Sequence, residues 1–214
     1  MCAAAALVIS CGSLVYAPGA HIQSQQGSGV TSLSAGVAAL PETKPEEAGT
    51  NLSGGAELKA AYQFSNVVRL EGNYFTNLRS FDLSSPVHGF GLHALLKLHD
   101  ADALDWLLSV RTQFLLNADD IEGYGWGAQF GPRWSFSDEL HTYALLGPIA
   151  GWRDIESEYG YGALANLGLG YSPATFITCS VDLAALAGYD AWASTTRFTL
   201  APSLQLTFHL PTAP

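Results

Sequence analysis

Charged residues are scarce in this sequence, since Asp, Glu, Lys and Arg make up 13% of its 214 residues and hydrophobic residues make up 48%. The charged share is about half of that in an average soluble domain, which indicates a surface in contact with lipid. Long hydrophobic runs are missing beyond the N-terminus, and a transmembrane helix requires roughly 18 or more apolar residues in succession. The remaining way to cross a bilayer is a closed β-barrel, because strand pairing then satisfies every backbone N–H and C=O group.

Basic residues and cysteines are also few. The 9 Lys and Arg residues compare with 19 Asp and Glu residues, so the formal net charge is −10. Since phosphate binding requires a basic surface, we expect no nucleic acid partner. Only Cys179 lies outside the N-terminal apolar segment that holds Cys2 and Cys11, so no disulfide framework is available. The length fits one domain without an internal linker, and nothing in the sequence indicates a cofactor.

The N-terminus is predicted to be a targeting segment. Residues 2–10 (CAAAALVIS) form an apolar run of the kind found in secretion signals, and this run is too short to span a bilayer. The run leads into Val-Ile-Ser-Cys, which resembles the lipobox of bacterial lipoproteins. This resemblance implies a signal peptide over residues 1–11 and acylation of the Cys11 thiol. The alternative is an ordinary signal peptide that is cut near residues 17–20.

A second resemblance begins at the same cysteine. The stretch CGSLVYAPGAH resembles the start of Bacteroidota-type outer-membrane lipoproteins, in which the cysteine leads into a short Val-Tyr-x-Pro segment. It implies a small bacterial outer-membrane protein. Residues 12–28, which are rich in Gln, Ser and Gly, are predicted to form a flexible N-terminal tether.

Apolar and polar residues alternate along residues 29–210, over segments of about 9 to 13 residues that are separated by turn-forming residues. In residues 54–64, one face holds Ala56, Leu58, Ala60, Tyr62 and Phe64, and the other holds Glu57, Lys59 and Gln63. A period of two excludes a helix and fits the tilted strands of a membrane barrel. We therefore predict an all-β fold, a closed antiparallel up-and-down transmembrane β-barrel over residues 29–210, followed by a short tail at 211–214.

Longer and shorter connections alternate along the chain, as they do between the two ends of outer-membrane barrels. The longer ones lie near residues 41–53, 77–86, 117–122, 152–158 and 188–194, and the shorter ones near 65–66, 99–104, 135–139 and 172–174. This pattern predicts about ten strands, with eight as the alternative, and places both ends of the barrel domain in the periplasm. Pro202 removes a backbone donor from the last strand, so we expect a bulge or a break in register there. An aromatic residue near the end of that strand, Phe208, resembles the signal for the barrel-assembly machinery.

The polar positions of the alternation carry most of the basic residues. By parity, the predicted charge network of the lumen consists of Glu57, Lys59, Arg69, Glu71, Lys97, Arg111, Arg133, Asp182 and Arg197. A single Arg or Lys on the lipid face would cost about 2 to 4 kcal/mol at the bilayer midplane, which favours this assignment. A barrel of this size is mostly filled by side chains, so a wide pore is disfavoured.

Acidic residues concentrate in the longer connections. The strongest candidates for a metal site are Asp119, Asp120, Glu156 and Glu158, since carboxylates are ligands for hard cations. No calcium-loop motif accompanies them, so we favour solvated loop tips and expect no metal. A barrel hydrolase would need a histidine beside a serine or carboxylate, and the candidates are His88, near Ser84 and Ser85, and His141.

We expect a protein of the bacterial outer membrane with a structural or interaction role, including that of an accessory subunit of a larger outer-membrane complex. Its partners would be outer-membrane lipid and other outer-membrane proteins. The alternatives are a narrow channel for small solutes or ions, an outer-membrane hydrolase, and a soluble lipocalin-like barrel that binds a ligand in an apolar interior. A catalytic role is not favoured, because no motif of the known barrel hydrolases surrounds either histidine.

Overall fold

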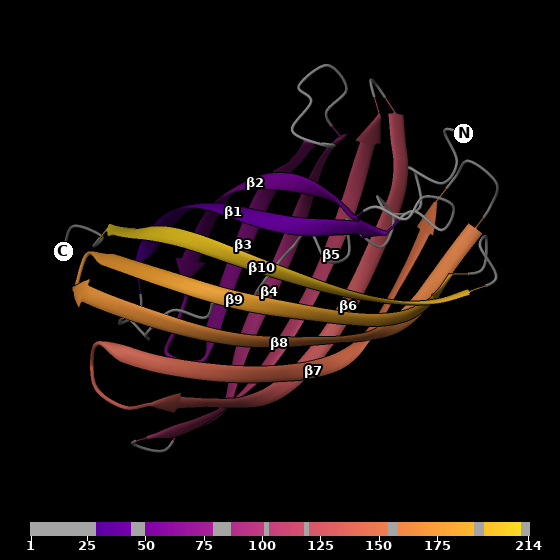
Figure 1. Ribbon diagram of the computed structural model, residues 1–214. Helices are drawn as coiled ribbons and strands as arrows, with labels where there is room; N and C mark the ends of the chain where they lie inside the picture. Colours follow the sequence, from indigo (N-terminus) through magenta and orange to yellow (C-terminus); the bar gives the residue numbers. More distant parts are fainter. Residues whose placement is uncertain are drawn as a thin grey trace.

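The computed structural model describes residues 29–43, 50–78, 87–100, 103–117, 120–153, 158–190 and 195–210. Its elements are β1 (Thr31–Thr43), β2 (Thr50–Gln63), β3 (Val68–Leu78), β4 (Val87–Asp100), β5 (Leu104–Asn117), β6 (Asp120–Ser135), β7 (Leu140–Arg153), β8 (Glu158–Ala174), β9 (Ile177–Asp190) and β10 (Thr195–Leu210). Neighbours in sequence pair antiparallel, and β1 pairs with β10, so the sheet closes (Figure 1). The predicted closed ten-strand barrel is confirmed, and the eight-strand alternative is wrong. Within the described residues, no helix is long and apolar enough to cross a membrane.

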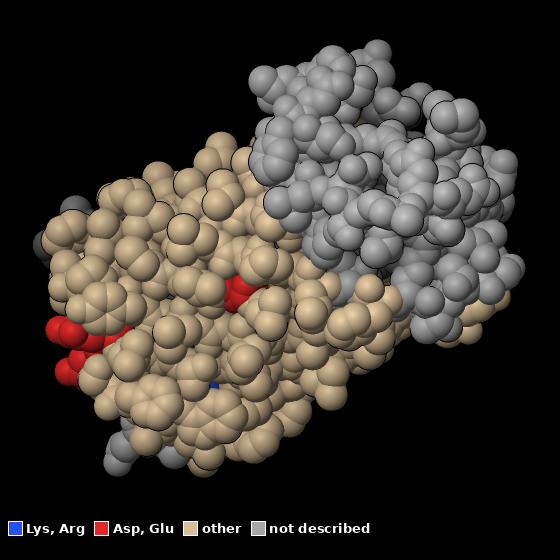
Figure 2. All heavy atoms as spheres, viewed as in Figure 1, with Lys and Arg blue, Asp and Glu red and all other residues tan. Residues whose placement is uncertain are grey.

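The alternation of the sequence places apolar side chains outside the barrel and polar ones inside. Leu58, Leu92 and Phe198 point outward and are more than half exposed, with relative exposures of 61%, 61% and 64%. Glu57 and Lys59, the polar neighbours of Leu58, are buried, and so is Glu71 on β3. The described part of the face in Figure 2 is almost free of charged groups, apart from one recessed acidic group, an acidic area at the edge and a small basic area. Such an exterior suits hydrocarbon and is unfavourable in water.

Short turns join the strands at the end of the barrel where β1 begins and β10 ends. Ser65 and Ser137 build two of these turns in the same way. The Ser65 hydroxyl oxygen accepts the Val68 N–H at 3.2 Å, and the Ser137 hydroxyl oxygen accepts the Leu140 N–H at 3.1 Å. Serine favours such turns because its hydroxyl replaces a backbone acceptor. At the opposite end, the strands continue into the predicted longer connections, so that β1 reaches Thr43.

The bulge or register break expected at Pro202 is wrong. β9 and β10 keep one register across it, with Pro202 opposite Leu183. The register shifts of the barrel instead lie between Lys97 and His99, between Leu115 and Leu116, and between Tyr171 and Ala174. On its other side, β10 pairs with β1 only as far as Ser203, which is opposite Ala38. Pro202 is the next residue of β10. Because proline has no N–H to donate, the pairing with β1 stops there.

Glycines on the inner face make room for rings from the neighbouring strands. A Cβ atom added to Gly168 would lie 2.1 Å from the Tyr143 ring, and one added to Gly89 would lie 2.2 Å from the Phe75 ring. Both rings are buried. The narrow interior is thus packed by large side chains that extend across glycine positions of the adjacent strand.

Candidate functional site

The charged residues of the interior form three neighbouring groups. The glutamate cluster holds Glu57, Lys59, Arg69, Glu71 and His93, on β2, β3 and β4. The transverse network holds Arg111, Gln129, Tyr143, Asn166 and Asp182, on β5 to β9. The Asp105 triad holds Lys97, Asp105 and Arg133, on β4, β5 and β6. Charges gather here because the inward face is the only one that lipid does not contact.

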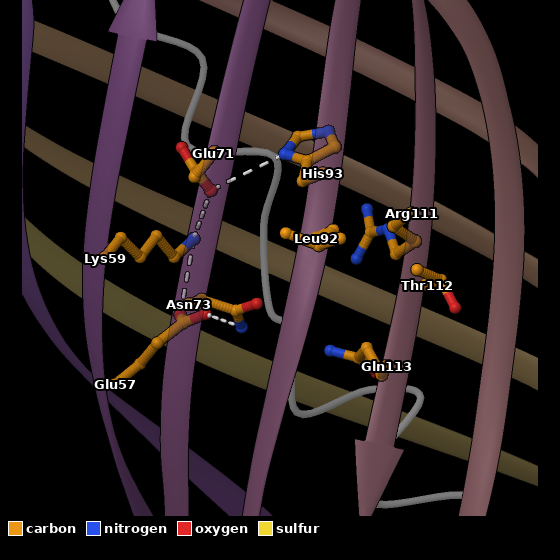
Figure 3. A pocket seen from close by; sticks show the side chains of 9 residues that line it. All are labelled: Glu57, Lys59, Glu71, Asn73, Leu92, His93, Arg111, Thr112 and Gln113. Atoms are coloured by element: carbon orange, nitrogen blue, oxygen red, sulfur yellow. Dashed lines mark hydrogen bonds and ion pairs between the residues drawn. The ribbon is translucent and has the colours of Figure 1, made fainter.

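Lys59 is the centre of the glutamate cluster. Its Nζ atom lies 3.3 Å from Glu57 Oε2 and 3.5 Å from Glu71 Oε1, so one cation joins two carboxylates (Figure 3). Glu71 also lies 3.7 Å from Arg69 Nη2 and 3.5 Å from His93 Nδ1. A buried charge is tolerated only when opposite charges and hydrogen bonds surround it, which is the arrangement found here.

Two polar groups complete the glutamate cluster. The Asn73 side chain donates to Glu57 Oε1 at 2.6 Å. The Nε2 atom of His93 lies 2.8 Å from the Ser109 hydroxyl, so the cluster extends to β5. Both carboxylates therefore have a cation and a further polar partner, which holds the four strands β2 to β5 together from the inside.

The transverse network runs along the inner side of the barrel wall from β5 to β9. Arg111 donates to Gln129 Oε1, and Gln129 Nε2 donates to Asn166 Oδ1 at 2.8 Å. Asn166 Nδ2 in turn donates to Asp182 Oδ1 at 2.8 Å, and the Tyr143 hydroxyl donates to the other carboxyl oxygen of Asp182. The five side chains form one connected hydrogen-bonded network, which rigidifies a polar interior when its members are satisfied.

The Asp105 triad lies toward the end of the barrel with the short turns. The carboxylate of Asp105 is 3.4 Å from Lys97 Nζ and accepts a hydrogen bond from Arg133. Sequence reasoning missed Asp105, because its position beside the connection near residues 99–104 made it part of an Asp-rich turn. Its parity with the inward Arg111 would have identified it.

The space between the glutamate cluster and Arg111 is small. A cavity of about 10 Å³ is lined there by Glu57, Lys59, Glu71, Asn73, Leu92, His93, Arg111, Thr112 and Gln113 (Figure 3). A single water molecule requires about 10 to 15 Å³ of such volume. This part of the interior therefore has room for about one water molecule and none for a solute.

Eight of the nine predicted network residues lie inside the barrel, and each of the eight belongs to one of the three groups. The backbone of Arg197 lies opposite Gly188, and its side chain is outside the described part. Cys11 and the metal candidates Asp119 and Glu156 lie outside the described residues. Asp120 and Glu158 begin β6 and β8, and their side chains are not described. Among the residues that are described, no three His, Cys, Asp or Glu side chains come together as a metal site.

The two histidines considered for hydrolysis have other partners. His88 Nδ1 lies 2.5 Å from the Tyr74 hydroxyl, and the two rings stack at 5.8 Å. His141 is buried, and its ring packs where a Cβ atom of Gly170 would lie. Ser84 and Ser85 fall outside the described residues.

Comparison with known proteins supports the fold. An outer membrane channel from Pseudomonas putida F1 superposes with a TM-score of 0.56 at 12% identity, over 90% of this chain and 99% of that one. The attachment invasion locus protein of Yersinia pestis gives a TM-score of 0.40 at 13% identity, over 86% of this chain and 99% of that one. No family model matches the sequence, and no curated protein is detectably similar to it.

The apolar belt on the outside of the closed barrel and the charges inside it indicate that the barrel lies in a membrane. An even-stranded, single-chain barrel with this surface is the architecture of bacterial outer-membrane proteins. The chain is a bacterial outer-membrane β-barrel. The soluble lipocalin-like alternative is wrong, because the outer-membrane barrel has its polar residues inside and its apolar residues outside, the reverse of a lipocalin.

Proposed function

We propose that this outer-membrane barrel has a structural and interaction role, as a subunit of a larger outer-membrane complex, and does not conduct solutes. The observation that carries the proposal is the filled interior. The three charged groups occupy the lumen side of eight of the ten strands, β2 to β9, and the cavity between two of them measures about 10 Å³. A conduit requires a continuous water-filled path, and paired buried charges occupy that path here.

The exterior supports an interaction role. Two apolar grooves indent the outer surface: one of about 550 Å³ lies over β9, β10 and β1 to β3, and one of about 410 Å³ lies over β5 to β9. The second is bordered by Trp106 and Phe130, whose rings stack at 5.0 Å. Depressions beside large aromatic groups are suited to receive side chains of a neighbouring membrane protein or acyl chains.

Conductance in a planar lipid bilayer tests the closed interior. We expect no stepwise current from the folded barrel above the protein-free background. The matched variant Arg111→Ala/Gln129→Ala removes two members of the transverse network and is expected to admit ions, which would show that the network closes the lumen. Regular current steps from the unmodified protein would refute the proposal and support the narrow-channel alternative. Both proteins must first show heat-dependent gel migration, so that misfolded material is not compared.

A subunit role predicts stable neighbours in the membrane. Lipid-phase crosslinking in native outer membranes, followed by purification and mass spectrometry, should recover one reproducible protein partner or a second copy of the chain. Recovery of lipid alone would argue against a complex while leaving the closed barrel unaffected. We do not propose a hydrolase, because the two candidate histidines have other partners. His88 is hydrogen-bonded with the Tyr74 hydroxyl, and the His141 ring packs on Gly170.

We further propose that Cys11 is acylated. The support is the resemblance of Val8, Ile9, Ser10 and Cys11 to a lipobox. The intact mass of the protein purified from membranes should equal that of a chain beginning at Cys11 plus its acyl groups, and Cys11→Ala should abolish this mass. A mature chain that begins near residues 17–20 would show an ordinary signal peptide instead.

A further inference from the structure

The larger outer groove, of about 550 Å³, runs across five neighbouring strands, from β9 through β10, β1 and β2 to β3. Its outward side chains come from two adjacent rows, and the members of each row lie opposite one another in the strand register. The first row consists of Cys179, Leu206, Ala35, Leu58 and Tyr74, and the second of Leu204, Val37, Ala56 and Thr76. The small side chains of Ala35, Ala56 and Cys179 leave room between the larger ones. We call this depression the oblique groove.

The two ends of the oblique groove differ in chemistry. At the β9 end the lining side chains are Cys179 and Leu206, both of which behave as hydrophobic groups. At the β3 end they are Tyr74 and Thr76, and Thr76 lies opposite His88 of β4. The Tyr74 hydroxyl lies 2.5 Å from His88 Nδ1, so three polar side chains meet at this end of the groove. The groove of about 410 Å³ has no hydroxyl or imidazole among the described side chains that line it.

Thr76 differs from two other threonines on the outward face. Thr112 donates to the Gly125 carbonyl oxygen at 3.2 Å, and Thr142 donates to the Gly168 carbonyl oxygen at 2.7 Å. Within the described residues, the half-buried Thr76 has no hydrogen-bond partner for its hydroxyl. A hydroxyl surrounded by hydrocarbon is costly without such a partner. Rotation about the Cα–Cβ bond is enough to aim it along the groove that Thr76 lines.

The polar end of the groove lies near one membrane interface. β3, with 11 residues, has about the length that crosses the hydrocarbon core, so its ends lie close to the two interfaces. Thr76 is two residues from the end of β3, and His88 is the second residue of β4 at the same end. This end carries the longer connections, which are extracellular in outer-membrane barrels. Cys179 is the third residue of β9, at the end with the short turns.

The oblique groove descends from its polar end through about one leaflet. Four strand spacings of about 4.8 Å make it roughly 19 Å long. Because barrel strands tilt by about 45°, a line across them drops by roughly 13 Å over this length. The hydrocarbon of one leaflet is about 15 Å deep, half of the roughly 30 Å core. The groove is thus polar near the interface and apolar over the depth of an acyl chain.

We propose that the oblique groove binds one acyl chain of an outer-leaflet lipid, and that Thr76 and His88 bind the carbonyl oxygen that links this chain to its head group. Both residues supply donors: Thr76 through its hydroxyl, and His88 through Nε2, since the Tyr74 hydroxyl occupies Nδ1. An apolar depression of this volume with a few polar groups is typical of a ligand site. The inference depends on the outer-membrane location of the barrel and not on its proposed subunit role.

Photo-crosslinking with two lipid probes tests the site and its direction. The full-length barrel is reconstituted in phosphatidylcholine vesicles that contain a small share of phosphatidylglycerol with a diazirine in one acyl chain. In the first probe the diazirine is next to the ester, and in the second it is at the chain end. We expect the first probe to label β3 and β4 around Tyr74 and His88, and the second to label β9 and β10 around Cys179 and Leu206. Peptide mass spectrometry locates the labels.

Matched variants separate the groove from the rest of the lipid-facing surface. Ala56→Phe fills the middle of the oblique groove and should lower labelling by the chain-end probe about tenfold. Ala165→Phe makes the same change in the groove of about 410 Å³ and should leave that labelling unchanged. Thr76→Val keeps the shape of the side chain without its hydroxyl, and should lower labelling of β3 and β4 by the first probe about threefold, as for the loss of one hydrogen bond.

Labels spread evenly around the barrel, and equally in Ala56→Phe, would overturn the proposal, because the lipid would then be unspecific. A reversed pattern, with the chain-end probe on β3 and β4, would overturn the assigned direction and with it the role of Thr76 and His88. Equal losses for Ala56→Phe and Ala165→Phe would overturn it as well. Every variant must show heat-dependent gel migration, so that misfolding is not read as loss of lipid. None of these outcomes concerns the lumen, so the conductance test of the proposed function stands apart.

Discussion

The ring of Tyr143 lies over Gly168 of the neighbouring strand, and its hydroxyl donates to Asp182 one strand further along the sheet. One side chain thereby links β7, β8 and β9 from inside the barrel. The glycine supplies the space, and the carboxyl group supplies the acceptor. The Tyr143 side chain therefore both fills space in the lumen and makes a hydrogen bond there.

Separate substitutions at Tyr143 and Gly168 should distinguish these two contributions. Tyr143→Phe keeps the ring and removes the hydrogen bond to a buried carboxyl oxygen, at an expected cost of about 1 to 3 kcal/mol. Gly168→Ala places a methyl group 2.1 Å from the ring and should cost about 1 to 3 kcal/mol by overpacking. Urea unfolding of the barrel in detergent micelles measures both free energies.

Gly72→Ala is the control for the glycine substitution, because a Cβ atom at Gly72 would meet nothing within 4 Å. It should leave the free energy of unfolding within about 0.5 kcal/mol of the unmodified protein. Equal losses for Gly72→Ala and Gly168→Ala would show that a general loss of backbone freedom, and not the ring contact, sets the effect.

Lys59→Met should destabilise the barrel by about 3 to 5 kcal/mol, since it removes the cation between two buried carboxylates. Glu71 keeps Arg69 and His93, whereas Glu57 keeps the Asn73 amide. The triple variant Glu57→Gln/Lys59→Met/Glu71→Gln removes the charges together and should recover part of this loss. The temperature at which the folded gel band converts to the unfolded one reports both changes. A triple variant less stable than Lys59→Met would contradict the assignment of the glutamate cluster as a coupled unit.

Asp105→Asn should weaken the barrel at the end with the short turns, because Lys97 and Arg133 share the Asp105 carboxylate. The expected loss in the free energy of unfolding is about 3 kcal/mol, as for the disruption of other buried ion pairs. Asp138→Asn in the exposed turn at residues 136–139 is the matched control and should change little. If both variants unfold at the same urea concentration, Asp105 does not contribute through this triad.

The sequence predicts the strands well where one face meets lipid and the other holds polar groups. The predicted segment 54–64 overlaps β2, which begins earlier, at Thr50, within the connection expected at 41–53; the turn expected at 65–66 follows β2. Residues 140–152 alternate poorly although they form β7, because their inward side chains include the apolar Tyr143, Leu145 and Ile149. Where the interior is itself apolar, both faces have the same character and the period of two disappears from the sequence.

The interior contacts were less accessible to sequence reasoning than the strands. Parity identified which charges face inward, but the pairing of Lys59 with Glu57 and Glu71 depends on the register between strands. The register between strands also determines where β1 and β10 stop pairing, which is beside Pro202. These two strands lie at opposite ends of the sequence. Contacts of this kind follow from closure of the barrel, which alternation within one strand does not specify.

Cys179 offers a direct test of the outward face. It is exposed, points away from the lumen and lines the apolar groove of about 550 Å³ over β9, β10 and β1 to β3. Because lipid surrounds this position, a nitroxide attached to Cys179 in liposomes should collide readily with oxygen and rarely with a water-soluble nickel complex. A nitroxide at Ser137→Cys, in a Cys179→Ser background, lies in an exposed turn and should show the opposite preference. Strong collision of the Cys179 label with nickel would place water at the groove and argue against its burial in the bilayer.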